Sequence, residues 1–315
     1  MDEKILESNL LMISHSYRSF VKDSIEPCSK HFSNVYTLFR YNPISQIYNH
    51  LPVSGLEKYG LSYKLDLTYL PDNYKVFPTP VTYLPIESQY KKLGNKHLNS
   101  ARKVIKKNKL GFSIIHSHFT WSAGYVGARL KEEYNVPFVL TAHGYDIYSL
   151  PFKDSEWREK IEYVLNTADH IITVSQSNLA CIKKLDVSTP VTVIPNGFRS
   201  NLFYPRESSE CRKSLKLPQD KRIILTVGGL EPVKDQRSLV EAIQKIVRER
   251  RDILCVIIGA GKLRPALERQ IRSLGLEGYV RLAGGKPHDE IPLWMNACDL
   301  FVLPSLRESF GVVQI

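Results

Sequence analysis

A carboxylate at the end of an apolar run is the first feature of the chain with recognisable chemistry. The run occupies 299–304, and Glu308 follows it with Ser309, Phe310 and Gly311 directly behind. A carboxylate can accept hydrogen bonds from two vicinal hydroxyl groups, and the amides of a glycine turn can donate to an anion. Because open α/β sheets bind ligands beyond their strand ends, this stretch predicts a ligand site. A Glu favoured only by a helix dipole is the alternative.

A lysine precedes a predicted helix in the stretch Val-Gly-Gly-Leu-Glu-Pro-Val-Lys-Asp at 227–235. The amino end of a helix and an ammonium group both attract anions, so Lys234 and the turn at Gly229 suit a diphosphate. A solvated loop lysine has the same sequence pattern. The later turn Gly-Ala-Gly-Lys at 259–262 completes neither a dinucleotide fingerprint nor a P-loop, which argues against a nicotinamide cofactor.

Three histidines follow or belong to apolar strands of the first half. His143 lies in Thr-Ala-His-Gly-Tyr-Asp at 141–146, where a strand end can expose the imidazole to a reacting group. A purely structural histidine is the alternative. His116 and His118 alternate along a strand and therefore share one face. Packing is favoured over a zinc site for this pair, because no third ligand is near in sequence.

Apolar runs alternate with amphipathic stretches along the chain, which indicates an α/β protein with parallel sheets. The first half predicts strands at 9–14, 34–39, 113–118, 137–142, 170–174 and 191–194, and helices at 88–109, 122–134, 154–167 and 176–185. The second half predicts strands at 222–227, 253–258, 280–283 and 300–303, and helices at 235–248, 263–273 and 289–297. The segment 59–85, rich in Tyr and Pro, is expected to be irregular or to hold edge strands.

The alternation is interrupted at 199–220 by a stretch rich in Ser, Pro, Asn and charge. We therefore predict one α/β domain over 1–200, a linker over 201–220 and a second α/β domain over 221–315. Because the second domain ends on a strand without a closing helix, we expect it to be incomplete at its carboxyl end.

The composition is that of a soluble globular protein, with 43% hydrophobic and 24% charged residues among 315. No apolar run reaches the roughly 18–20 residues that span a bilayer, and the charged start Met-Asp-Glu-Lys gives no sign of a signal peptide. Five scattered cysteines without a Cys-x-x-Cys pair argue against a disulfide framework or a zinc site and favour a reducing compartment.

The net charge of +11 includes one local concentration at 90–109, where eight Lys or Arg residues occur without an acid. A solvated helix face explains such a run. The alternative is attraction of 91–109 to anionic lipid headgroups or substrates, worth about 1 kcal/mol per basic residue near a surface. Nucleic acid is disfavoured as a partner, because aromatic residues are not interleaved and no binding motif is present.

Taken in order, these stretches resemble the family 4 (group 1) retaining glycosyltransferases of the GT-B fold. The matching stretches are Ser-Ile-Ile-His-Ser-His at 113–118, Thr-Ala-His-Gly-Tyr-Asp at 141–146, Ile-Ile-Thr-Val-Ser at 171–175, Val-Ile-Pro-Asn-Gly at 193–197, Val-Gly-Gly-Leu-x-Pro-x-Lys at 227–234, Val-Ile-Ile-Gly-Ala-Gly at 256–261 and Leu-Pro-Ser-x-x-Glu-Ser-Phe-Gly at 303–311. The last stretch, together with Lys234, is the most specific. It matches the donor-sugar motif E-x7-E up to the residue before its second Glu.

The resemblance implies an α/β fold with two Rossmann-like domains, in which the nucleotide-sugar donor binds mainly to the second domain and the acceptor to the first. It implies that His143 acts catalytically near the anomeric carbon and that Glu308 holds the donor sugar. The residues implied at the donor diphosphate and sugar are Gly229, Lys234, Ser309, Phe310, Gly311 and Val312, and those near the nucleotide base are Gly285, Lys286 and Pro287. Neither a cofactor nor a metal is implied.

Three departures from the family pattern matter. Gly229 stands where the family often has Arg, which removes a bidentate contact to the diphosphate. The first strand is followed by Ser-His-Ser-Tyr-Arg-Ser-Phe at 14–20 instead of a Gly-rich turn. The second Glu of the motif, which binds the ribose hydroxyls in the family, would follow Ile315, so we expect the chain to be truncated within the motif.

The resemblance therefore predicts a retaining, hexosyltransferase-type enzyme of polysaccharide biosynthesis that moves a sugar from a nucleoside-diphosphate sugar to a glycan or lipid-linked acceptor. The predicted location is the cytoplasm, with peripheral contact to the inner membrane face through 91–109. One alternative is a sugar-nucleotide epimerase of the same fold, which needs no acceptor. The other is a non-catalytic nucleotide-sugar-binding remnant, which Gly229 and the truncation would favour.

Overall fold

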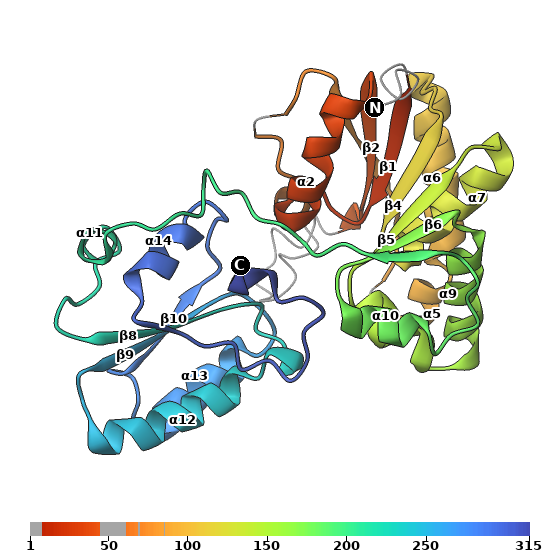
Figure 1. The fold of residues 1–315 in the computed structure, drawn as a ribbon. Helices are drawn as coiled ribbons and strands as arrows, with labels where there is room; N and C mark the ends of the chain where they lie inside the picture. Colours follow the sequence, from red (N-terminus) through yellow and green to blue (C-terminus); the bar gives the residue numbers. More distant parts are fainter. Residues whose placement is uncertain (1–7, 45–60, 69, 85) are drawn as a thin grey trace. The chain divides into compact units, whose positions relative to one another are not determined.

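The computed structural model describes residues 8–44, 61–68, 70–84 and 86–315, and the chain divides into two compact units, 1–197 and 198–315. Each unit consists of a parallel sheet with helices on both faces (Figure 1). The predicted α/β class with two Rossmann-like domains is therefore confirmed. The charged start of the chain and parts of the segment 59–85 lie outside the described residues.

The first unit contains a seven-stranded parallel sheet of order β3-β2-β1-β4-β5-β6-β7. Its strands are β1 (Asn9–Ser14), β2 (Asn34–Tyr41), β3 (Tyr74–Pro80), β4 (Ile114–His118), β5 (Phe138–Ala142), β6 (His170–Thr173) and β7 (Val191–Val193). β3 comes from the segment that was expected to be irregular or to hold edge strands, and it does lie at an edge. Its two prolines suit that position, because an edge strand can leave amide positions unpaired.

Helices cover both faces of this sheet because the buried strands are apolar on both sides. Its helices are α2 (Ser19–Ile25), α4 (Leu61–Lys64), α5 (Glu87–Lys91), α6 (Leu93–Asn108), α7 (Tyr125–Tyr134), α8 (Tyr145–Tyr148), α9 (Ser155–Thr167) and α10 (Gln176–Ile182). Leu11 and Ile13 belong to the core that includes residues of α6, α7 and α9, whereas Leu10 and Met12 belong to the core on the α2 side. The alternation along β1 follows the two-residue period of a strand.

The strand order reverses at β1, because the chain first adds β2 and β3 on one side and then β4 on the other. In open parallel sheets this switch point leaves a crevice beyond the carboxyl ends of the strands, and ligands bind there. The residues that follow β1 and β4 therefore have the best position for binding in this unit. The segment after β4 is a π turn (Thr120–Gly124), so α7 begins at Tyr125 and not at 122 as predicted.

The second unit contains a four-stranded parallel sheet of order β10-β9-β8-β11. Its strands are β8 (Arg222–Val227), β9 (Ile253–Ile258), β10 (Val280–Gly284) and β11 (Leu300–Phe301), and its helices are α11 (Ser208–Ser214), α12 (Gln236–Glu249), α13 (Arg264–Ser273) and α14 (Ile291–Ala297). All six residues of β9 are buried. One face of the sheet packs against α12 and α13, and the other packs against α11 and α14 (Figure 1).

The stretch 201–220, which was expected to be a linker, contains α11 and contributes to the core of the second unit. Cys211 and Leu217 are buried against this unit's sheet. Arg212 donates through Nε to the Ala297 carbonyl at 2.8 Å, and through Nη2 to Asp299 at 2.6 Å. The polar composition of the stretch conceals these anchors, because a seven-residue helix needs only one or two apolar side chains to dock.

Among the described residues, no helix is both long and apolar enough to cross a membrane.

Candidate functional site

Lys234 and Glu308 meet in the second unit although 74 residues separate them in the sequence. The Lys234 ammonium donates to Glu308 Oε1 at 2.5 Å, and their side chains are 29% and 26% exposed. Lys234 ends a short 3-10 turn just before α12, as the sequence predicted for a lysine beside a helix start. Glu308 reaches it from the loop that follows β11, the neighbour of β8 in the sheet. Two residues that the sequence singled out separately therefore form one polar centre.

The turn after Glu308 presents backbone amides beside this pair. Gly311 has a φ of 70°, and a side-chain carbon there would lie 3.0 Å from the Gln314 amide oxygen, so a larger residue would be strained. In the part of the chain that the structure describes, the amide groups of Ser309 and Phe310 donate to no acceptor. Amides in such a turn can donate to a phosphate or a hydroxyl oxygen. Val312 begins the final 3-10 turn.

Two glycine turns follow β8 and β9 and touch each other. Gly259 has a φ of 153°, and a side-chain carbon there would lie 1.9 Å from the Gly228 carbonyl oxygen, so only glycine fits. Gly229 is different, because the nearest atom to an added carbon would be 3.8 Å away. Its carbonyl oxygen accepts from Gln236 Nε2 at 3.0 Å. The position at which the family often has Arg is therefore free of steric restriction.

The Gly285-Lys286-Pro287 loop follows β10 at the same sheet edge. A side-chain carbon on Gly285 would lie 3.7 Å from the Ala260 side chain, which places this loop beside the turn after β9. The Lys286 ammonium lies 3.3 Å from Glu290 and 5.4 Å from the centre of the Trp294 ring. Its charge is thus engaged within the second unit.

His143 follows β5 in the first unit and is 8% exposed. Its Nε2 lies 2.9 Å from Nδ1 of His118, the last residue of β4. The two rings are 17° from parallel with centroids 5.1 Å apart, consistent with a hydrogen bond in the plane of both rings. His116 stacks on His118 at 4.7 Å and bonds the Thr141 hydroxyl through Nε2 at 2.7 Å. The predicted shared face of His116 and His118 is therefore confirmed.

Burial keeps these imidazoles neutral. It lowers the pKa of His143 to about 3, with a smaller contribution from His116, and it lowers the pKa of His116 to about 4. Burial also lowers the pKa of His118 well below its ordinary value. Between two neutral rings one nitrogen must donate and the other accept.

Either ring of this pair can be the donor. The Nε2 atom of His118 is buried and has no hydrogen-bond partner among the described residues. With its proton on Nδ1, His118 leaves this Nε2 atom as an unused lone pair, and His143 then accepts at Nε2 and carries its own proton on Nδ1. With the opposite tautomers, His143 is the donor at Nε2 and the proton of His118 lies on its Nε2 atom.

Asp146 fixes the turn on which His143 lies. Its carboxylate is 6% exposed and accepts from the amides of Gly144 at 2.7 Å and Thr120 at 2.9 Å. Burial raises the pKa of this carboxyl group, although the amide hydrogen bonds act in the opposite direction. The carboxylate thus links the ends of β4 and β5. The sequence prediction assigned no role to Asp146 or to the His118–His143 contact, although both residues belong to the stretches that it singled out.

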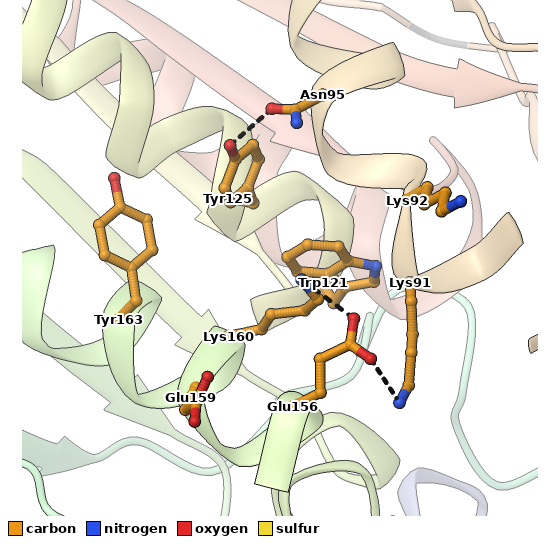
Figure 2. A pocket seen from close by; sticks show the side chains of 9 residues that line it. All are labelled: Lys91, Lys92, Asn95, Trp121, Tyr125, Glu156, Glu159, Lys160 and Tyr163. Atoms are coloured by element: carbon orange, nitrogen blue, oxygen red, sulfur yellow. Dashed lines mark hydrogen bonds and ion pairs between the residues drawn. The ribbon is translucent and has the colours of Figure 1, made fainter. Parts of the chain in front are cut away.

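A separate hollow of about 330 Å³ lies on the helical side of the first unit. Figure 2 shows Tyr125 pointing toward Asn95, and Glu156 lying between Lys91 and Lys160. The two lysines are 2.9 and 3.4 Å from the Glu156 carboxylate. Lys91 also lies 2.8 Å from the Asp154 carboxylate, so Glu156 and Asp154 together compensate these two cations.

The basic segment 91–109 forms the end of α5 and most of α6. Its apolar residues face the core, and its cations other than the half-buried Lys91 are exposed. Within the described ranges, no three His, Cys, Asp or Glu side chains are grouped so that they could hold a metal ion.

Two family models match the chain, and together they include residues from both units. The model of glycosyl transferases group 1 matches residues 207–315, and the model of Glycosyltransferase Family 4 matches residues 66–201. The chain belongs to the group 1 glycosyltransferases.

Curated relatives are similar to about two thirds of the chain. A D-inositol 3-phosphate glycosyltransferase of Thermobispora bispora is 31% identical over 222 residues, which is 65% of this chain and 52% of the relative. A putative teichuronic acid biosynthesis glycosyltransferase of Bacillus subtilis is 29% identical over 215 residues, which is 68% of this chain and 52% of the relative. The chain thus spans about half the length of the curated relatives it matches.

Solved structures with the same fold cover nearly the full chain. Sucrose-phosphate synthase from Thermosynechococcus elongatus has a TM-score of 0.76 at 20% identity, covering 98% of this chain and 78% of that one. HepE of Anabaena, solved in complex with UDP and glucose, has a TM-score of 0.70 at 21% identity, covering 98% and 77%. At this level of identity the likeness concerns the fold alone, and it supports the predicted GT-B architecture.

Proposed function

We propose that this glycosyltransferase moves a hexose-type sugar from a nucleoside-diphosphate sugar to a glycan or lipid-linked acceptor, with retention of configuration at the anomeric carbon. The observation that carries the proposal is the contact between Lys234 and Glu308 at 2.5 Å. Beside it, the backbone amides of Ser309 and Phe310 donate to no acceptor in the described part of the chain. Cation, carboxylate and amides are the groups needed to hold a diphosphate and a sugar together. HepE, which has the same fold, was solved with UDP and glucose.

In the proposed donor site, each group has a distinct partner. The Lys234 ammonium binds the diphosphate as a point charge, supported by the start of α12. The Glu308 carboxylate accepts hydrogen bonds from two sugar hydroxyls, while the amides of the Ser309–Val312 turn donate to the remaining oxygens. Gly229 leaves room for the diphosphate, and the Gly285–Pro287 loop borders the base. No cofactor or metal has a role in this proposal.

His143 is the proposed catalytic residue of the first unit. Because burial lowers its pKa to about 3, it is neutral at pH 7 and donates through Nδ1 without adding charge. In the proposed reaction the bond between the anomeric carbon and the diphosphate oxygen breaks, and a bond to the acceptor oxygen forms on the same face. The acceptor proton passes to the departing phosphate, and the His143 donor stabilises the charge that develops near it.

The acceptor side of the proposal includes a membrane contact. The exposed cations of 91–109 suit anionic headgroups, which would bring the protein to the inner membrane face from the cytoplasm. The names of two relatives, an inositol phosphate glycosyltransferase and a teichuronic acid biosynthesis enzyme, are consistent with a polar or polymeric acceptor.

Alanine substitutions in the complete protein test the donor site. Glu308→Ala and Lys234→Ala should each lower kcat/KM at least about 100-fold, the scale of a charge or positioning contact made in the transition state. Lys262→Ala is the matched control, because Lys262 is a lysine on the neighbouring turn whose side chain is 63% exposed.

Binding measurements separate the two roles. Lys234→Ala should weaken the binding of a nucleoside diphosphate. Glu308→Ala should weaken the binding of the sugar-bearing donor only. Wild-type turnover in either alanine variant would refute the site assignment. Interconversion of the sugar nucleotide without an acceptor would instead identify an epimerase.

A further inference from the structure

Arg40 is a buried cation whose hydrogen-bonding capacity is only partly used. It lies near the carboxyl end of β2 and is 4% exposed. Its Nη1 donates to the Ser122 hydroxyl at 2.7 Å, and its guanidinium lies 5.5 Å from the centre of the Tyr83 ring. Its Nε is buried and has no hydrogen-bond partner among the described residues. A guanidinium nitrogen without an acceptor in the interior is costly unless a ligand supplies one.

Two further basic side chains come from elements that end at the same edge of the sheet. His15 follows β1 directly, and its ring stacks on Phe119 with centroids 4.7 Å apart and planes 13° from parallel. Lys64 ends α4, which is held beside the end of β1 by a hydrogen bond from the Tyr17 amide to the Lys64 carbonyl at 2.8 Å. The Nε2 atom of His15 is also buried, with no partner in the described part of the chain.

The charged forms of these three groups repel one another, and among the described residues no carboxylate compensates them. Burial and the charge of Arg40 lower the pKa of Lys64 to about 7. Burial, Arg40 and Lys64 lower the pKa of His15 well below its ordinary value. Across residues 8–44, 61–68, 70–84 and 86–315, no carboxylate forms an ion pair with any of the three. Uncompensated buried cations destabilise a protein, so their clustering requires a reason other than stability.

The cluster occupies the switch point of the first unit. His15 follows β1, and Ser122, the partner of Arg40, lies in the turn after β4. Open parallel sheets bind their ligands at this place. The Phe119 ring on which His15 stacks also contacts His143, with ring centroids 4.7 Å apart. One aromatic ring therefore separates the cationic cluster from the proposed catalytic imidazole.

We propose that Arg40, Lys64 and His15 form a subsite of the first unit that binds a phosphate group carried by the acceptor. This inference rests on the proposed transferase function for the identity of the ligand. A phosphate suits the cluster better than a carboxylate, because it carries up to two negative charges and offers oxygens to an arginine and a lysine at once. The diphosphate of the donor has the same chemistry, and the experiment below distinguishes the two sources.

A titration of the complete protein with inorganic phosphate at constant ionic strength tests the subsite. Lys64→Met removes one charge, and it removes no side-chain hydrogen bond within the described chain. Loss of one charged contact should lower the affinity for phosphate at least about tenfold. The same variant should melt at a higher temperature than the wild type without phosphate, because an uncompensated charge is gone. Arg40→Met should also lower the affinity for phosphate. Because this substitution additionally removes the hydrogen bond to Ser122, it serves only as a second variant.

Control variants separate the subsite from the donor site. Lys75→Met removes an exposed lysine of β3 in the same unit and should leave phosphate affinity unchanged. Phosphate binding that persists in Lys234→Ala and is lost in Lys64→Met, with UDP affinity retained in Lys64→Met, supports an acceptor subsite. Unchanged phosphate affinity in Lys64→Met overturns the proposal, and so does a matching loss of UDP affinity, which would assign the cluster to the donor. Because phosphate titration needs no turnover, its outcome is independent of the activity of the Lys234 variant.

Discussion

Replacing His118 by leucine should impair turnover far more than it destabilises the protein. The substitution deletes the partner that lies 2.9 Å from Nε2 of His143. It also deletes the Nε2 atom of His118, which is buried without a partner in the described structure. The lost hydrogen bond costs about 1 kcal/mol, and removal of an unsatisfied polar atom offsets part of it. We therefore expect the free energy of unfolding to change by no more than about 1–2 kcal/mol.

The effect on catalysis should be larger, because in the proposed arrangement His118 donates to Nε2 of His143 and thereby keeps the proton of His143 on Nδ1. Without it, the imidazole can rotate or place its proton on Nε2, and the donor at Nδ1 is lost for a fraction of the time. A loss of orientation and tautomer worth about 1.4–2.7 kcal/mol corresponds to a 10- to 100-fold lower kcat. KM for the donor should change little, because the proposed donor contacts belong to Lys234 and Glu308.

His118→Asn is the matched control, since its amide nitrogen can donate from nearly the position of the imidazole Nδ1. It should retain kcat within about fivefold, while ¹⁵N chemical shifts should report the Nδ1–H form of His143 in the wild type and in this variant only. A folded His118→Leu protein with wild-type kcat would refute the positioning role. So would an asparagine variant that is as slow as the leucine variant.

Two further predictions concern stability. Gly259→Ala should destabilise the second unit by at least about 3 kcal/mol, because the new carbon would lie 1.9 Å from a backbone oxygen, whereas Gly278→Ala meets no atom within 4 Å and should change the melting temperature little. Acid should destabilise the first unit, because burial lowers the pKa values of His143 and His116 to about 3 and 4 in the folded protein. Below pH 6.5 the unfolded chain therefore binds more protons than the folded chain, and the free energy of unfolding decreases as the pH is lowered. The two groups together should cost about 5–6 kcal/mol between pH 6.5 and 4, partly offset by Asp146, whose raised pKa acts in the opposite sense. A pH series of denaturant titrations that shows flat stability over this range would contradict the burial of the histidines.

The sequence predicted the strands well because their signal is local. β8 and β9 are continuous apolar runs between turn residues, and a buried parallel strand has no other typical pattern. The contact between Lys234 and Glu308 was not predicted. The family resemblance implied only that both residues bind the donor, and each residue alone is equally typical of a solvated loop. α11 was missed because its docking depends on Cys211 and on the distant partners of Arg212, and neither is visible as a period.

The histidine contacts show why the remaining part of a site escapes sequence analysis. His118 and His143 are 25 residues apart, and they meet only because β4 and β5 pair with His118 opposite Thr141. A shift of that register by one residue would turn His118 to the other face of the sheet. Arg40 and Lys64 converge in the same way, through strand order and a turn, so charge counting along the chain cannot find them.

The two charged centres should respond differently to their ligands, because among the described residues a carboxylate compensates Lys234 but none compensates Arg40 or Lys64. Lys234 and Glu308 neutralise each other, and with side chains 29% and 26% exposed such a pair contributes about 0–1 kcal/mol. A diphosphate that binds Lys234 therefore loses little free energy by breaking this ion pair. The Glu308 carboxylate is then available to the sugar hydroxyls. Arg40 and Lys64 have no such partner in the described chain, so an incoming phosphate removes an existing repulsion as well as forming new contacts. Relief of this repulsion increases the affinity of the cluster for phosphate, and the pKa of Lys64 should increase on binding. Phosphate should then stabilise the first unit by the amount that its affinity and concentration determine.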